Sequence, residues 1–124
     1  PAAYEAAFEA AALVLREGDL LAIFPEGGIT RDGALQPFKG GIVKLLERAQ
    51  ADGLAVPVIP MALTNLWGSY FSRIEQVNGE RVAMVRPFRR GLFSRVGLNV
   101  GPPLMPDQVQ PDALRARIEG LLAP

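Results

Sequence analysis

The chain has 124 residues, enough for one small domain with its own hydrophobic core. Apolar residues make up 49% of the sequence and charged residues 21%, which excludes an intrinsically disordered chain. The 13 basic and 13 acidic residues cancel, so net charge does not indicate a nucleic-acid-binding protein. Because the sequence has no cysteine and no histidine, it lacks disulfides, thiolate nucleophiles and a histidine base, and we expect no metal site.

The first part of the chain predicts a helix followed by a buried strand. Residues 2–17 are rich in alanine, and their apolar side chains recur at helical spacing up to Gly18, a plausible helix end. That stripe consists of Tyr4, Phe8, Ala11 and Leu15. Residues 20–24 are all apolar, which is typical of a strand buried on both faces of a parallel sheet.

A glycine-rich loop then leads into a second helix and a second strand. The loop spans residues 25–41, and the helix predicted over 42–51 ends at Gly53. Its inner face carries Ile42, Leu45, Leu46 and Ala49. Residues 56–63 predict a strand in which Pro57 and Pro60 suit strand ends or bulges, because proline has no N–H to donate.

Two short strands, at 81–85 and 96–100, and a last amphipathic helix over 112–122 complete the predicted order. Strand, helix and strand in succession favour a right-handed βαβ unit. We therefore expect an α/β fold with a mixed, partly parallel sheet flanked by helices. No linker or repeat divides the chain, so we expect one domain over residues 1–124.

Residues 24–33 carry the most informative pattern, Phe-Pro-Glu-Gly-Gly-Ile-Thr-Arg-Asp-Gly. Ligands of open α/β sheets bind beyond the carboxyl ends of strands, and glycine lets the backbone approach them closely. Arg31 and Lys39 add positive charge for a phosphate, and Glu26 can accept hydrogen bonds from hydroxyls or from Arg31. The alternative is an ordinary glycine-rich connection with a local ion pair between Glu26 and Arg31.

A second candidate for anion binding is the stretch 81–106, which carries five arginines and no acidic residue. They are Arg81, Arg86, Arg89, Arg90 and Arg95. Such a cluster is either a solvated surface or a site for phosphates or acidic lipid headgroups.

Residues 24–27 together with Thr30 and Arg31 resemble the third conserved block of the glycerolipid acyltransferases, the 1-acylglycerol-3-phosphate acyltransferases and their relatives. That block usually reads Phe-Pro-Glu-Gly-Thr-Arg-Ser, so Gly28 and Ile29 look like an insertion. Residues 35–41 resemble its continuation, 56–63 the fourth block, and 100–104 the last strand of the domain. Residues 65–73 resemble a subgroup in which this domain occurs within larger proteins.

The resemblance implies a site but not a complete catalyst. In this family a His-x4-Asp block upstream of the third block supplies the base, and the chain has no histidine. The chain therefore looks like the C-terminal part of a single acyltransferase domain, truncated at its N-terminal side. It would carry no catalytic residue and would be inactive alone. The chain begins at Pro1 rather than at a methionine, which also favours a piece of a longer protein.

The same resemblance implies the reaction and the residues that bind the acceptor. The parent protein would transfer a fatty acyl group to 1-acylglycerol-3-phosphate, a related lysolipid or glycerol phosphate, in phospholipid biosynthesis. Acyl-CoA or acyl-carrier protein would be the donor, with no bound cofactor. The substrate-binding residues would be Glu26, Gly27, Thr30 and Arg31, with Arg31 as the phosphate ligand.

Other residues keep two interpretations each. Pro57 and Pro60 would flank the site, with a structural role favoured, and Lys39 would face either phosphate or solvent. The aromatic side chains Trp67, Tyr70 and Phe71 suit core packing more than an acyl channel.

The resemblance also implies a location at the cytoplasmic side of the cell membrane, either by peripheral contact or as part of a larger membrane protein. We expect no nucleic-acid partner. An exposed sheet edge and apolar face would favour a homo-oligomer. Two functions remain as alternatives. The first is a non-catalytic module that binds phosphate or an anionic membrane through the arginines of 81–95. The second is a small hydrolase or transferase with Glu26 as its base.

Overall fold

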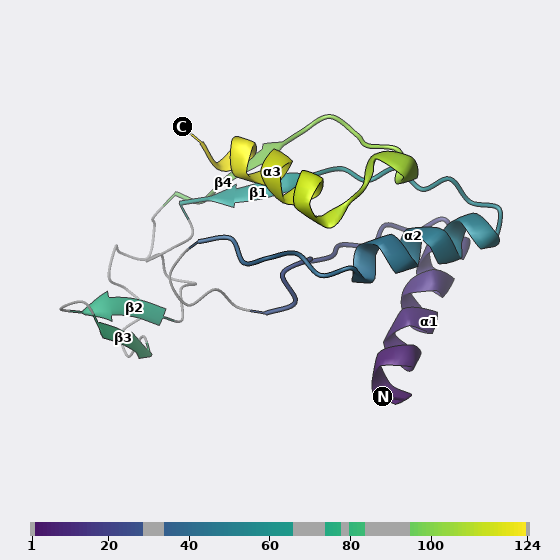
Figure 1. The fold of residues 1–124 in the computed structure, drawn as a ribbon, viewed down its shortest axis with the longest axis horizontal. Helices are drawn as coiled ribbons and strands as arrows, with labels where there is room; N and C mark the ends of the chain where they lie inside the picture. The colour runs from purple at the N-terminus through teal and green to yellow at the C-terminus, as the bar shows by residue number, and fades with distance from the viewer. Residues whose placement is uncertain (1, 29–33, 66–73, 78–79, 84–94, 124) are drawn as a thin grey trace.

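The computed structural model describes residues 2–28, 34–65, 74–77, 80–83 and 95–123 (Figure 1). Its helices are α1 (Ala2–Arg16), α2 (Gly41–Ala51) and α3 (Pro111–Leu122), with a short 3₁₀ turn η1 (Pro106–Gln108) before α3. Its strands are β1 (Met61–Thr64), β2 (Ile74–Val77), β3 (Glu80–Ala83) and β4 (Gly97–Val100). The three predicted helices are confirmed to within one residue at each end. Strands β3 and β4 lie at the stretches predicted as strands over 81–85 and 96–100, of which residues 84 and 85 are outside the described residues.

The ends of α1 and α2 follow the glycine signals of the sequence. After α2, Gly53 adopts a left-handed conformation with φ of 81°, and its N–H donates to the carbonyl of Gln50 at 2.9 Å. The next amide, that of Leu54, donates to the carbonyl of Ala49 at 2.9 Å. This pair of bonds satisfies carbonyls that a helix end otherwise leaves open. Gly18, with φ of 80°, ends α1 in the same way.

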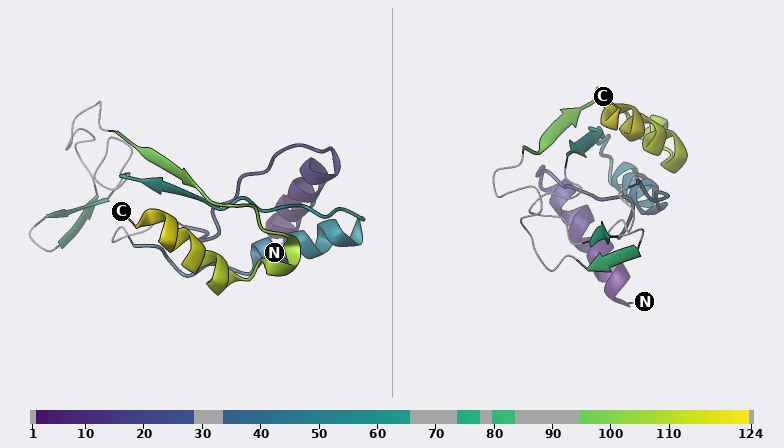
Figure 2. Two further views of the ribbon diagram at one scale, coloured as in Figure 1. Left: turned by 90° about the horizontal axis from the view of Figure 1, so that it is seen from above. Right: turned by 90° about the vertical axis from the view of Figure 1, so that its left-hand side faces the viewer.

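The hydrophobic core lies between α2, α3 and the segments next to them. Its buried members are Phe38, Ile42, Leu46, Leu104, Val109 and Leu114. All four apolar residues predicted for the inner face of α2 are buried, as expected. Figure 2 shows α3 lying along the sheet of β1 and β4, with which it is in contact. The core therefore joins residues 35–46 to the last third of the chain.

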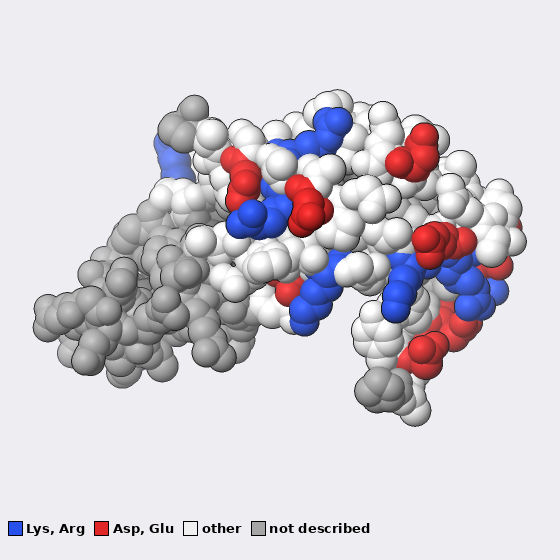
Figure 3. All heavy atoms as spheres, viewed as in Figure 1, with Lys and Arg blue, Asp and Glu red and all other residues white. Residues whose placement is uncertain are grey.

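The helix α1 packs against α2 and contributes little to this core. Ala12 is its buried residue, whereas Tyr4, at one end of the predicted apolar stripe, is exposed. Glu9 and Arg48 join the two helices, with Oε1 and Nη1 2.7 Å apart and Oε2 and Nη2 3.2 Å apart. Figure 3 shows acidic and basic side chains adjoining one another over α1 and α2. Because both side chains are about half exposed, the pair stabilises the fold by less than about 1 kcal/mol.

Both ladders of the described strands are antiparallel: β1 pairs with β4, and β2 with β3. The partly parallel sheet thus stays a prediction. The strand predicted over 56–63 is regular only from Met61, and before it Val58 forms a single bridge to Leu104. Prolines at 57 and 60 explain the interruption, because neither can donate to a ladder.

The sheet of β1 and β4 has one covered face and one open face. Ala62 is 3% exposed, and α3 packs against β1. Its neighbours Met61 and Leu63 point the other way, because successive side chains of a strand alternate. Their cross-strand partners are Val100 and Leu98, and all four side chains are 43–56% exposed. We call these four residues the open face.

The prediction of a buried strand at residues 20–24 is wrong for this structure. The segment has no regular secondary structure, and Leu20 is 99% exposed and Phe24 75%. None of its N–H groups donates to a described residue. Five apolar residues in a row are a strand signal only where neighbouring strands supply hydrogen bonds and cover.

None of the helices in the described ranges combines the length and the apolar character that a membrane span requires.

Candidate functional site

The glycine-rich pattern begins with a tight turn. The N–H of Gly27 donates to the carbonyl of Phe24 at 3.1 Å, which closes the turn around Pro25 and Glu26. Gly27 has φ of 64°, in the left-handed region that glycine adopts without strain. The second glycine of the pattern, Gly28, shows no such constraint. The structure therefore explains why the first of these glycines is needed.

A second segment, residues 34–40, lies against this turn and is hydrogen-bonded to it at two points. The N–H of Lys39 donates to the carbonyl of Pro25, and the N–H of Gln36 donates to Oε2 of Glu26, each at 2.8 Å. The carboxylate of Glu26 is half-buried and faces this segment. A carboxylate offers about four acceptor positions on its two oxygens, so one amide leaves room for a hydroxyl of a ligand.

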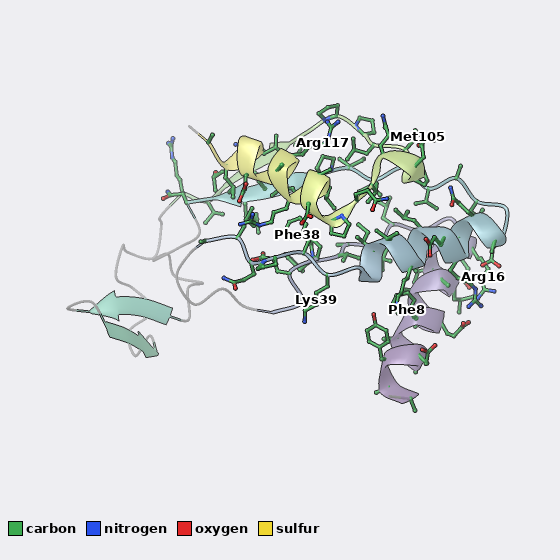
Figure 4. All side chains as sticks on the ribbon, viewed as in Figure 1. Phe8, Arg16, Phe38, Lys39, Met105 and Arg117 are labelled. Atoms are coloured by element: carbon green, nitrogen blue, oxygen red, sulfur yellow. The ribbon has the colours of Figure 1, made fainter. Side chains whose placement is uncertain are left out.

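The side chain of Lys39 lies across Gly27. Its Cδ and Nζ atoms are each 3.0 Å from the point where a Cβ at position 27 would stand. Figure 4 shows Lys39 on one side of the segment and the neighbouring Phe38 on the other, toward α3. No carboxylate in the described ranges forms an ion pair with Lys39. Lys39 is exposed beside the glycine turn, so both interpretations of it, facing phosphate or facing solvent, stay open.

The segment 34–40 is held by the hydrophobic core and by a hydrogen bond from α3. Phe38 belongs to the buried core, and Leu35 packs against it. From α3, Nη2 of Arg115 donates to the carbonyl of Leu35 at 3.1 Å. Arg115 was missed in the sequence, because 80 residues separate it from Leu35 and no motif joins them.

A model of the acyltransferase family matches residues 1–64, just over half of the 124-residue chain. The chain belongs to the acyltransferase family. The matched part of this acyltransferase chain contains the turn, Glu26, Gly27 and Lys39, and it is consistent with the resemblance to glycerolipid acyltransferases. No curated protein and no solved structure matches the chain.

The structure of this acyltransferase chain brings some predicted site residues together and leaves others undescribed. Glu26 and Gly27 share the turn. Thr30 and Arg31 lie outside the described residues, as do the aromatic side chains at 67, 70 and 71. Of the arginine cluster, Arg95 alone has a described side chain, and that side chain is exposed.

The two prolines of the fourth block differ in this acyltransferase chain. Pro60 is buried and accepts the N–H of Gly101 through its carbonyl at 2.9 Å, whereas Pro57 is exposed. A structural role therefore fits Pro60, as the sequence favoured. Within the ranges that the structure describes, no three acidic side chains gather closely enough to hold a metal ion.

Proposed function

We propose that this chain binds the glycerol phosphate part of the acceptor in an acyltransferase of phospholipid biosynthesis. The observation that carries the proposal is that one exposed glycine turn carries the carboxylate of Glu26, while the side chain of Lys39 lies against its Gly27. An acceptor such as 1-acylglycerol 3-phosphate offers a free hydroxyl and a phosphate. Glu26 accepts the hydrogen bond of a hydroxyl, and Lys39 attracts the phosphate.

In the proposed reaction the acceptor hydroxyl attacks the carbonyl carbon of an acyl thioester. The new ester bond forms, the carbon–sulfur bond of acyl-CoA or acyl-carrier protein breaks, and the hydroxyl proton passes to a base. The chain has no histidine, so we propose that the His-x4-Asp block of the family supplies this base from outside the 124 residues. Peripheral contact with the cytoplasmic side of the cell membrane belongs to the same proposal, since the acceptor is a lipid.

The roles of Glu26 and Lys39 are tested by binding, because the chain alone is expected to show no turnover. The isotope-labelled chain is titrated with sn-glycerol 3-phosphate and, separately, with inorganic phosphate, and amide shifts of residues 24–40 are followed by NMR. We expect Lys39→Gln to weaken both ligands about tenfold, because a charge-assisted hydrogen bond is worth about 1.5 kcal/mol or more. Glu26→Gln should weaken glycerol phosphate alone.

The matched control is Lys44→Gln, which removes an exposed lysine from α2. If Lys39→Gln and Lys44→Gln weaken binding of the ligands equally, Lys39 contributes only its positive charge and not a specific contact. Equal affinity for inorganic phosphate and glycerol phosphate, unaffected by Glu26→Gln, would contradict acceptor binding and favour a simple anion-binding module. Thioester release from acyl-CoA by the chain alone would contradict the proposed division of roles.

A further inference from the structure

A single peptide group connects the last helix to the candidate site. The carbonyl of Leu35 accepts a hydrogen bond from Nη2 of Arg115 at 3.1 Å. The N–H of the same peptide group, which belongs to Gln36, donates to Oε2 of Glu26 at 2.8 Å. The guanidinium of Arg115 and the carboxylate of Glu26 thus hold opposite sides of one planar group.

We propose that Arg115 is a positioning residue of the acceptor site and acts on Glu26 through the Leu35–Gln36 peptide. The proposal rests on the proposed function, since it concerns the carboxylate that is proposed to accept a hydrogen bond from the acceptor hydroxyl. Residue 115 lies outside the part of the chain that the family model matches.

The physical basis is the rigidity and the polarity of the peptide group. Its atoms lie in one plane, so the carbonyl and the N–H cannot turn separately. A positively charged donor on the carbonyl polarises the group and strengthens the hydrogen bond that its N–H makes. Arg115 therefore fixes the direction of the Gln36 N–H and makes it a better donor to Glu26.

Arg115 is itself held in place. Its Nη2 lies 2.9 Å from Oε1 of Glu119, one helical turn further along α3. The residue before it, Leu114, is 2% exposed and belongs to the same core as Phe38. Because α3 and the segment 34–40 share this core, their distance is set by packing rather than by the hydrogen bond alone.

A purely structural role of Arg115 is the competing explanation, and a double-mutant cycle separates the two. If Arg115 acts through Glu26, its removal affects glycerol phosphate binding only while Glu26 is present. If Arg115 only fixes the segment 34–40 to α3, or only adds charge, its removal weakens glycerol phosphate binding equally in the chain with Glu26 and in the Glu26→Gln variant.

The experiment uses Arg115→Gln, Arg115→Lys and the control Arg117→Gln. Arg117 is an exposed arginine of the same helix, labelled in Figure 4, and it forms no ion pair with a described residue. Two readouts are measured on the 124-residue chain: hydrogen exchange of the Gln36 amide without ligand, and affinity for sn-glycerol 3-phosphate with inorganic phosphate as the reference ligand.

We expect Arg115→Gln to accelerate exchange of the Gln36 amide about tenfold and to weaken glycerol phosphate about fivefold to tenfold, as expected for one hydrogen bond to a charged group. Inorganic phosphate binding should change less. In the Glu26→Gln background the same substitution should weaken glycerol phosphate no further. Arg115→Lys should change exchange of the Gln36 amide and glycerol phosphate affinity less than Arg115→Gln does. If Arg115→Gln does not fold, Arg115→Lys is the variant that tests the proposal. Arg117→Gln should change neither readout.

Unchanged exchange of the Gln36 amide in Arg115→Gln would overturn the proposal, as would an equal loss of affinity in both backgrounds at position 26. If the unsubstituted chain does not bind glycerol phosphate, the proposed function fails, whereas the exchange readout still decides whether Arg115 orders the peptide that holds Glu26.

Discussion

The candidate site is built from two apolar-rich segments that are anchored very differently. Residues 34–40 hold Phe38 in the core, at 9% exposure, and are gripped from α3 by Arg115. Residues 20–24, which lead into the turn, leave Phe24 75% exposed and donate no hydrogen bond to a described residue. The turn with Glu26 and Gly27 therefore takes its position from the segment that follows it in sequence, through two hydrogen bonds.

The largest expected effect separates the two phenylalanines of this comparison. Phe38→Ala should lower the free energy of unfolding by about 3 to 5 kcal/mol, because it leaves a cavity in the core. Phe24→Ala should change it by less than about 0.5 kcal/mol, the usual range for exposed positions. Urea denaturation of both variants measures the difference. Similar losses would mean that residues 20–24 are packed in solution, contrary to the structure.

The open face of β1 and β4 is, like residues 20–24, an apolar part of the chain with little cover, and it provides a second test of the comparison. We expect the chain to self-associate through Met61, Leu63, Leu98 and Val100, because this apolar face has no cover among the described residues. Leu98→Glu should weaken self-association about a hundredfold, equivalent to about 2.8 kcal/mol. Sedimentation equilibrium measures the change.

The control for this prediction is Leu13→Glu, an equally large substitution at a half-exposed position on α1. It should leave the association constant unchanged. A monomeric chain at high micromolar concentration, before any substitution, would show that the open face needs no second copy.

The smallest expected effect concerns the turn where the two segments meet. Gly27→Ala should cost about 1 to 2 kcal/mol, the strain of a left-handed conformation for a residue with a Cβ, and it should displace the flexible end of Lys39. Gly28→Ala should cost little, since nothing lies within 4 Å of its Cβ position. Thermal unfolding compares the two, and glycerol phosphate titration reports the displacement of Lys39. Equal costs at 27 and 28 would show that the turn is not held as described.

The sequence allowed the three helices to be predicted, and it singled out the loop that carries Glu26 and Gly27. Helix α2 followed from Ile42, Leu45, Leu46 and Ala49, because its apolar period matches a helix with one buried face. The loop with Glu26 and Gly27 was recognised from its glycines and its resemblance to a known block, whereas the tight turn within it was not predicted. Each of these signals is local, so a short stretch of sequence contains the whole physical cause.

What could not be predicted depends on contacts distant in sequence. The apolar run 20–24 specifies a strand only if neighbouring strands exist, and periodicity does not report them. The antiparallel pairing of β1 with β4 joins residues more than thirty positions apart. The contact of Arg115 with Leu35 leaves no signal in either residue, since an arginine on a helix surface is ordinary.

Residues 34–40 separate two tasks along one short stretch of backbone. Leu35 and Phe38 face inward and stabilise the fold, while Lys39 faces outward and the amide of Gln36 faces Glu26. A substitution at position 39 therefore changes the charge beside the turn without disturbing the hydrophobic interior. Under the proposed function, the residues that stabilise this segment and the residue that meets the ligand are different, so the charge at the site can be changed by one substitution at little cost in stability.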